Sequence, residues 1–371
     1  MLFGILSVVV FFTILSVLVI AHEWGHFITA RFFGVRVEEF GLGFPPKART
    51  LGTSKGTEYT LNWLPLGGFV RLKGESGEDS QDEDSFAKKA VWKRLIILCA
   101  GVFMNFLIAI LVFWVGFSTV GLHADLIRST EGGTKTEQKI VIYPQKDSPA
   151  AKAGAETGDA VVSVEGKNIT TVDEFVAGIR SFTGKDLAMV VRRSGGEKTL
   201  SVPVGTAEIK ETIDQEKTTT RPVIGVEVRE LQHVRFPVHI ALVKACEATA
   251  NIITLNARML WDIVAKLAQG HKPQDGFVGP VGIAYATGTG LRMGIQEMIG
   301  LIAQLSLGLA IMNILPIPAL DGGRALFAII EKIKGRPMRA NVENMIHTIG
   351  FLALMLLVLV ITFRDVVRFF F

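Results

Sequence analysis

Long apolar runs separate the polar stretches of this chain, and four of these runs have the length of membrane-crossing helices. They cover residues 2–29, 95–120, 298–330 and 346–363. About 20 predominantly apolar residues are enough to cross the hydrocarbon core of a bilayer as a helix. The pattern therefore predicts a polytopic α-helical membrane protein with four transmembrane helices.

The third run differs from the others because polar residues and helix breakers interrupt it. It contains Asn313, Pro316, Pro318, Asp321, Gly322 and Gly323. A broken helix at membrane depth is tolerated only where it faces protein or a water-filled cavity. We therefore predict that the third transmembrane helix is broken and that its break faces such an environment.

Two polar stretches have the composition of β-rich regions. Residues 35–73, between the first two runs, predict a β-hairpin region with strands at 58–64 and 69–72. The insert at 121–222 predicts an α+β domain between transmembrane helices 2 and 3. Its predicted strands are 140–143, 160–164, 187–192 and 199–204, and its predicted helix is 173–181, with Thr171 as N-cap.

The remaining polar segments are expected to be less regular. Residues 74–84 are acidic and predict a mobile, solvated link. Residues 209–220 are polar and charged and predict a flexible loop. Residues 238–269 carry apolar side chains at helical intervals, which predicts a surface helix pair against the insert or the membrane.

Composition and charge narrow the classes of protein further. Of the 371 residues, 49% are hydrophobic, and the formal net charge of +4 is too small for a nucleic-acid surface. Cys99 and Cys246 are far apart and do not resemble a disulfide framework. The first run lacks a basic leader and a small-residue cleavage site, so we expect a retained transmembrane helix rather than a signal peptide.

Lys and Arg in the flanks of the runs predict the orientation, because cytoplasmic loops carry an excess of them. Residues 31–94 and 324–339 contain many basic side chains, and no Lys or Arg precedes the first run. Both stretches are therefore predicted to be cytoplasmic, with both termini and the insert outside. Arg364 and Arg368 near the carboxy terminus oppose this orientation but are outnumbered.

His22, Glu23 and His26 stand at the end of the first run in an HExxH pattern. Residues i and i+4 share one face of a helix, so the two histidines can bind one Zn²⁺ while Glu23 takes a proton from water. Ionisable groups at membrane depth are costly, which favours a functional role. The alternative is a histidine pair that anchors a helix at the headgroups.

Zinc with two histidines needs a third protein ligand if one position is to stay open for water. Asp321 lies in the broken third run at a matching depth, and a metal would compensate its charge. The alternative is an Asp that caps the following helix. Asn313 can either bond an incoming peptide backbone or satisfy carbonyls freed by Pro316 and Pro318, and chemistry alone does not decide between these roles.

This chemistry predicts metal-assisted peptide hydrolysis, with Glu23 as base and then as proton donor. A transmembrane substrate must unwind locally, because helical peptide bonds are hydrogen-bonded and shielded. An edge of the 35–73 region can solve this problem by pairing with the extended substrate. The alternative is a cytoplasmic plug that makes no substrate contact.

Several motifs resemble the site-2 protease family of intramembrane zinc metalloproteases, in particular the regulator-of-sigma-E protease group. They are residues 22–26 (HEWGH), 41–44 (GLGF), 62–70 (NWLPLGGFV), 279–283 (GPVGI) and 313–323 (NILPIPALDGG). The resemblance covers nearly the whole chain and implies His22, His26 and Asp321 as zinc ligands, Glu23 as catalytic residue and Asn313 as a substrate contact. One departure is Val102, where the family often has Pro.

The insert resembles a single PDZ domain, on residues 148–154 (SPAAKAG) and 158–161 (GDAV). The resulting division is an N-terminal membrane segment at 1–121, a PDZ domain at 122–228, an amphipathic helical linker at 229–290 and a C-terminal membrane segment at 291–371. By resemblance, the PDZ domain and the following helices filter substrates by size.

The resemblance implies regulated intramembrane proteolysis at a bacterial inner membrane, with the active site toward the cytoplasm. The expected substrate is a single-span membrane protein already trimmed outside, such as an anti-sigma factor, or a signal-peptide remnant. The alternatives are a catalytically idle PDZ-containing membrane adaptor or chaperone, and a transporter. A transporter predicts repeated halves, and no internal repeat is visible in the sequence.

Overall fold

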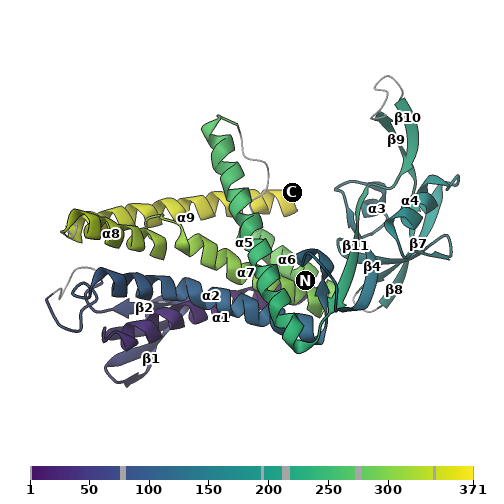
Figure 1. Ribbon diagram of the computed structural model, residues 1–371. Helices are drawn as coiled ribbons and strands as arrows, with labels where there is room; N and C mark the ends of the chain where they lie inside the picture. Colours follow the sequence, from purple (N-terminus) through teal and green to yellow (C-terminus); the bar gives the residue numbers. More distant parts are fainter. Residues whose placement is uncertain are drawn as a thin grey trace. The chain divides into compact units, whose positions relative to one another are not determined.

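The structure, a computed structural model, describes residues 2–75, 81–193, 196–210, 218–271, 278–336 and 340–370. It divides into two compact units (Figure 1). Unit 1 comprises Met1–Val112, Ala248–Gly288 and Leu301–Phe371, and unit 2 comprises Phe113–Glu247 and Thr289–Gly300.

Long apolar helices dominate the chain. They are α1 (Leu2–Phe32), α2 (Val91–Thr119), α5 (Val238–Ala268), α7 (Ile295–Ile314) and α9 (Ala340–Phe370), with the shorter α6 (Pro280–Met293) and α8 (Asp321–Lys334). By length and composition, five helices in the described part of the chain can cross a membrane. Four of them lie in the predicted runs. The fifth is α5, which is one continuous helix of 31 residues and not a helix pair.

The predicted break in the third run is confirmed. Helix α7 ends at Ile314 and helix α8 begins at Asp321. A hydrogen bond to α9 stabilises the turn between them: the backbone N–H of Ala319 donates to Nδ1 of His347, a residue of α9, at 2.9 Å. A Cβ at Gly322 would lie closer than 3.0 Å to the carbonyl of Ile314. This glycine therefore lets the start of α8 pack against the end of α7.

The hairpin region consists of β1 (Val37–Ser54) and β2 (Thr57–Leu72), which pair antiparallel in two registers. Phe40 is opposite both Tyr59 and Val70, so the long strands fold over into a small sheet. The predicted strands at 58–64 and 69–72 are confirmed, and both belong to β2. The segment 68–72 pairs with residues 37–42 of β1. Apolar side chains from α1, α2 and the sheet form one core, which includes Phe27 and Phe40.

Unit 2 is built around an antiparallel seven-stranded sheet with the order β3-β11-β4-β5-β7-β8, and β6 pairs with β5. The strands are β3 (Leu122–His123), β4 (Thr134–Pro144), β5 (Asp159–Val164), β6 (Lys167–Asn168), β7 (Asp186–Arg193), β8 (Gly196–Pro203) and β11 (Val226–Arg235). The short helices are η1 (Ala124–Leu126), α3 (Pro149–Lys152) and α4 (Val172–Arg180).

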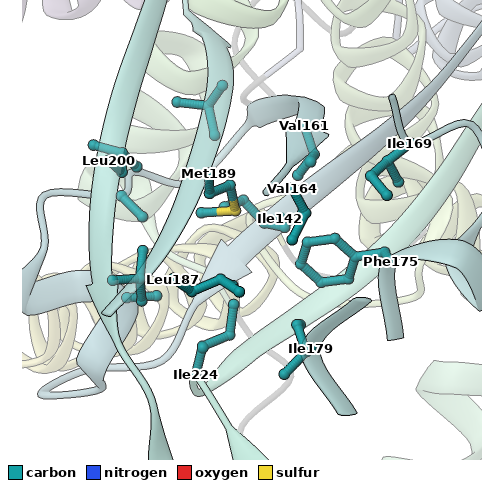
Figure 2. Close-up of a cluster of buried hydrophobic side chains, with 14 of the residues drawn as sticks. Ile142, Val161, Val164, Ile169, Phe175, Ile179, Leu187, Met189, Leu200 and Ile224 are labelled. Carbon is teal, nitrogen blue, oxygen red and sulfur yellow. The ribbon is translucent and has the colours of Figure 1, made fainter. Parts of the chain in front are cut away.

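The core of unit 2 forms between this sheet and α4. Phe175 and Ile179 of α4 point toward Ile142, Val164 and Leu187 of the strands (Figure 2). The four predicted strands and the predicted helix are confirmed. Thr171 caps α4 as predicted, in a reciprocal capping box with Glu174.

Strand β11 corrects the predicted start of the helical linker. The sequence predicts residues 229–235 in an amphipathic helix, yet they extend β11, which pairs along its length with β4. Val226 and Val228 pack against the core of unit 2 from this strand. Residues 226–229 alternate between apolar and charged side chains, which is a strand signal that the sequence reasoning missed, and the alternation breaks at Glu230.

The sequence predicts that residues 209–220 and 74–84 are flexible, but parts of both segments form regular contacts. The ends of the predicted loop at 209–220 belong to the paired strands β9 (Gly205–Lys210) and β10 (Thr218–Val223), and residues 211–217 lie outside the described residues. In the acidic link, Lys73 Nζ binds Asp82 at 2.6 Å and Asp84 at 2.8 Å. Residues 76–80 of this link also lie outside the description.

Candidate active site

The structure brings His22, His26 and Asp321 together inside unit 1. The two histidines are buried one turn apart on α1, with ring centroids 4.9 Å apart. Oδ2 of Asp321, at the start of α8, lies 2.9 Å from Nε2 of His22 and 3.3 Å from Nε2 of His26. His22 and Asp321 are 299 positions apart in the sequence, yet one donor atom from each of the three residues lies close enough to bind the same metal ion.

The other nitrogen of each imidazole faces helix α2. Nδ1–H of His26 donates to the carbonyl of Ile97 at 2.8 Å, which leaves Nε2 as the lone-pair nitrogen. Nδ1 of His22 lies 3.3 Å from the side-chain amide of Asn105, which is fully buried. Outer hydrogen bonds of this kind fix the tautomer and the ring orientation of metal-binding histidines.

The side-chain amide of Asn105 bears on whether His22 can bind a metal ion. Its Oδ1 is buried and has no hydrogen-bond partner among the described residues. A carboxamide can be turned by 180° without changing its shape. In the turned orientation, Oδ1 of Asn105 would accept a hydrogen bond from Nδ1–H of His22, and Nε2 of His22 would carry the lone pair that a metal ligand needs.

Gly101 of α2 keeps the space between the imidazoles open. A Cβ at this position would lie closer than 3.0 Å to Nε2 of both His22 and His26. A neighbouring contact is equally tight, because a Cβ at Gly25 would lie 2.5 Å from the carbonyl oxygen of Ala100. Helices α1 and α2 therefore approach each other closely beside the three donor atoms.

These residues fit a catalytic zinc ion. Two imidazole nitrogens and one carboxylate oxygen form a common ligand set for such ions, with a fourth position left open. The donors converge, both histidines have outer hydrogen-bond partners, and a glycine leaves room beside their Nε2 atoms.

A cavity of about 450 Å³ opens beside the three donors and is lined by both Glu23 and Asn313. Glu23 accepts a hydrogen bond from the backbone N–H of Val70. The wall at this point is the 68–72 segment of β2, of which Gly68, Phe69, Val70 and Leu72 line the cavity. The side-chain amide of Asn313 donates to the carbonyl of Leu309 at 3.1 Å. Asn313 thus bonds a carbonyl of its own helix while it also faces the cavity.

Sequence reasoning missed several residues that support this site. Asn105 is a buried amide in a span of apolar residues, and that polarity was an available signal. Gly101 and His347 have no comparable signal, because their contacts depend on how α2 and α9 pack. Arg324 and Glu75, which form an ion pair, also line the cavity.

The fold and the site define an integral membrane protein with the donor set of a zinc hydrolase, and the comparisons with known proteins agree. The model of peptidase family M50 matches residues 10–357, and the chain belongs to this family. It is a zinc metalloprotease, and its cofactor is Zn²⁺.

Three relatives illustrate the similarity. A putative zinc metalloprotease of Mesorhizobium japonicum is 30% identical over 364 residues, which cover 93% of this chain and 94% of the relative. The zinc metalloprotease RasP of Oceanobacillus iheyensis is 29% identical, covering 98% and 99%. The regulator of sigma E protease of Salmonella typhi is 26% identical, covering 96% and 98%.

Proposed function

We propose that this chain is an intramembrane protease in which His22, His26 and Asp321 hold the zinc ion and Glu23 is the catalytic acid–base residue. The observation that carries the proposal is the convergence of the three donors beside a cavity that Glu23 lines. Histidines and carboxylates among apolar helices are costly unless they pair or bind a metal.

The chemistry divides between the ion and the chain. When bound, zinc supplies Lewis-acid activation of water and of the scissile carbonyl. Glu23 removes a proton from the attacking water and then delivers it to the leaving amine. The hydrogen bond from the Val70 N–H holds the Glu23 carboxylate in the cavity. Asn313, on the same cavity, bonds the substrate backbone.

The 68–72 segment of β2 is the proposed docking edge for the substrate. It lines the cavity and pairs with β1. An unwound substrate segment can add to such an edge through main-chain hydrogen bonds, which presents its peptide bonds in extended form. This mode of binding requires the substrate helix to unwind near Glu23.

The proposed substrates are single-span membrane proteins that another protease has already trimmed on the outer side. A relative named regulator of sigma E protease supports a role in regulated proteolysis, with an anti-sigma factor as substrate. Signal-peptide remnants are a second substrate of the same chemical kind. We place the protein in a bacterial inner membrane.

The close contact between His22 and Asp321 supports a topology with four membrane spans, in which α5 lies on the membrane surface. Helix α2 and helix α7 are two crossings, which return the chain to the side where α1 ends. A third crossing by α5 would put Asp321 at the opposite face, away from His22. Helix α5 is also the least apolar of the five candidate helices. The active site is then toward the cytoplasm, with the termini outside.

The β-rich portion of unit 2 is proposed to be the PDZ domain, on the extracytoplasmic side. Its end moves from residue 228 to Arg235, where β11 ends. The division otherwise remains as predicted, with membrane segments at 1–121 and 291–371 and a helical linker before the second of them.

The site assignment is tested by measuring zinc per chain and proteolysis together. We expect His22→Ala and Asp321→Asn to lose both zinc and activity, because each removes a donor. We expect Glu23→Gln to keep zinc at the wild-type level and to lose at least about 100-fold in cleavage rate, as expected when general acid–base catalysis is removed.

Trp24→Phe provides the matched control, because it changes the neighbouring residue of the motif, which is exposed. It should retain zinc and activity. Full zinc occupancy in Asp321→Asn would show that the Asp321 carboxylate is not a zinc ligand. Undiminished cleavage by Glu23→Gln would refute the catalytic assignment.

A further inference from the structure

A second cluster of metal-binding side chains lies in unit 2, outside the candidate active site. It consists of His123 in β3, His233 in β11 and Glu297 in the first turn of α7. Their donor atoms all lie within 4.8 Å of one another. In the described part of the chain, this is one of two groups of at least three such side chains, and the other is the active-site group.

His233 is the most informative member of this cluster. It is fully buried, yet neither of its ring nitrogens has a hydrogen-bond partner among the described residues. Buried polar groups are nearly always paired, so an exception calls for an explanation such as a water molecule or an ion. Oε1 of Glu297 is a second buried atom that lacks a partner in the described structure.

Nε2 of His233 and Oε1 of Glu297 face each other across a gap that is wide enough for a metal ion. Nε2 of His233 lies 3.7 Å from Oε1 of Glu297, too far for a hydrogen bond. Two ligands on one tetrahedral zinc, with bonds of about 2.0–2.2 Å, lie about 3.4 Å apart. Nε2 of His123 forms a hydrogen bond of 2.5 Å with Oε2 of the same carboxylate, and a bound ion would replace this hydrogen bond. The two imidazole rings are tilted by 50° to each other, with centroids 4.6 Å apart.

The distances between carboxylate and imidazole atoms in this cluster can be compared with those in the candidate active site. There, the carboxylate oxygen lies 2.9 Å and 3.3 Å from the two imidazole nitrogens. In unit 2 the two oxygens of Glu297 share the contacts: Oε2 lies 2.5 Å from Nε2 of His123, and Oε1 lies 3.7 Å from Nε2 of His233. Both clusters combine two buried or half-buried histidines with one carboxylate, which is a ligand set that suits Zn²⁺.

Two charged neighbours complete the surroundings. Nζ of Lys139 lies 4.0 Å from Oε1 of Glu297, an ion pair too long for a hydrogen bond, so a metal ion would compete with Lys139 for this oxygen. Oε2 of Glu137 lies 3.8 Å from Nδ1 of His233, on the far side of the ring from Glu297. Metal-binding histidines commonly donate their outer N–H to a carboxylate, and Glu137 is the nearest carboxylate to Nδ1 of His233 but is too distant for a hydrogen bond.

We propose that His123, His233 and Glu297 form a second Zn²⁺ site, which is structural and separate from the active site. The ion would link β3 and β11 of the sheet to the first turn of α7. The fourth coordination position is left to water. Lys139 is the cation that competes with the metal for Glu297.

The test counts zinc in the full-length protein without a histidine tag, after zinc loading and removal of free metal. The wild type should retain about two zinc ions per chain, and the double variant His22→Ala/His26→Ala should retain one. Adding Glu297→Gln to that double variant should abolish the remaining ion, while adding His239→Ala should not. His239 is an exposed histidine of the same unit and serves as the control.

A second measurement keeps the test decisive if the double variant does not fold. In the wild-type background, Glu297→Gln alone should lower the zinc count from about two to about one. Where the double variant does fold, added zinc should raise its thermal midpoint, and Glu297→Gln should remove this shift. The proposal is overturned if folded His22→Ala/His26→Ala retains no zinc, or if Glu297→Gln leaves the count unchanged in both backgrounds.

Discussion

At the scale of single residues, the absence of a side chain matters as much as its presence. Gly101 touches no substrate and donates to no metal, yet a methyl group there would lie closer than 3.0 Å to Nε2 of both His22 and His26. Overpacking of this kind forces neighbouring side chains out of place, typically at about 1–3 kcal/mol. Here the displaced groups are the donors themselves.

We therefore expect Gly101→Ala to lower the zinc affinity at least tenfold, which corresponds to about 1.4 kcal/mol. Metal content and a competition titration with a zinc chelator measure this loss. Gly308→Ala is the matched control, because it adds the same methyl group to α7 where nothing lies within 4 Å. Equal zinc affinity in the two variants would contradict the described geometry around the donors.

The sequence identifies the candidate ligands but not the residues that orient them. His22, Glu23 and His26 follow from a local spacing, and Asp321 follows from its place in an interrupted apolar run. Asn105 and the carbonyl of Ile97 belong to another helix, and only the crossing of α1 and α2 brings them to the histidines. Contacts that depend on tertiary packing leave no local pattern in the sequence.

At the scale of elements, the 68–72 segment connects fold with function. Its proposed role depends on backbone groups and not on side chains, so proline is the informative substitution. We expect Val70→Pro to slow cleavage at least tenfold, because it removes an N–H that bonds Glu23 and disrupts the edge offered to the substrate. Zinc content should stay at the wild-type level.

Val70→Ala separates the backbone effect from the loss of the side chain, since it keeps the N–H. Initial rates on a single-span substrate, together with zinc analysis, give the comparison. If Val70→Pro and Val70→Ala cleave equally fast, the hairpin is a plug that does not present substrate.

The prediction of helices and strands succeeded where burial imposes a clear pattern of apolar and polar residues on the sequence. The apolar runs became helices, and the alternating segments of unit 2 became β4, β5, β7 and β8. It failed at the paired strands β9 and β10, whose residues do not alternate clearly, and at β11, where the alternation at 226–229 is short. Apolar side chains of β11 pack against the core of unit 2, but most of its residues are polar, which hides the strand in the sequence.

At the scale of the whole molecule, one unit contains the proposed active-site residues among apolar helices, and the other unit is rich in β-strands. Apolar run length and strand alternation are both strong signals, and from them the sequence predicts membrane segments around an inserted β-rich region. The sequence also predicts four membrane spans, whereas α5 is a fifth helix that is long and apolar enough to cross. The proximity of His22 to Asp321 supports the proposed count of four.

The most direct measurement is cleavage of a trimmed single-span substrate in proteoliposomes, with the product ends mapped by mass spectrometry. The wild type should cut within or beside the transmembrane segment, lose activity on chelation and regain it with added Zn²⁺. Glu23→Gln should give no product under the same conditions. Cleavage by Glu23→Gln at the wild-type rate, or cuts confined to the substrate's soluble regions, would contradict the account of an intramembrane zinc protease.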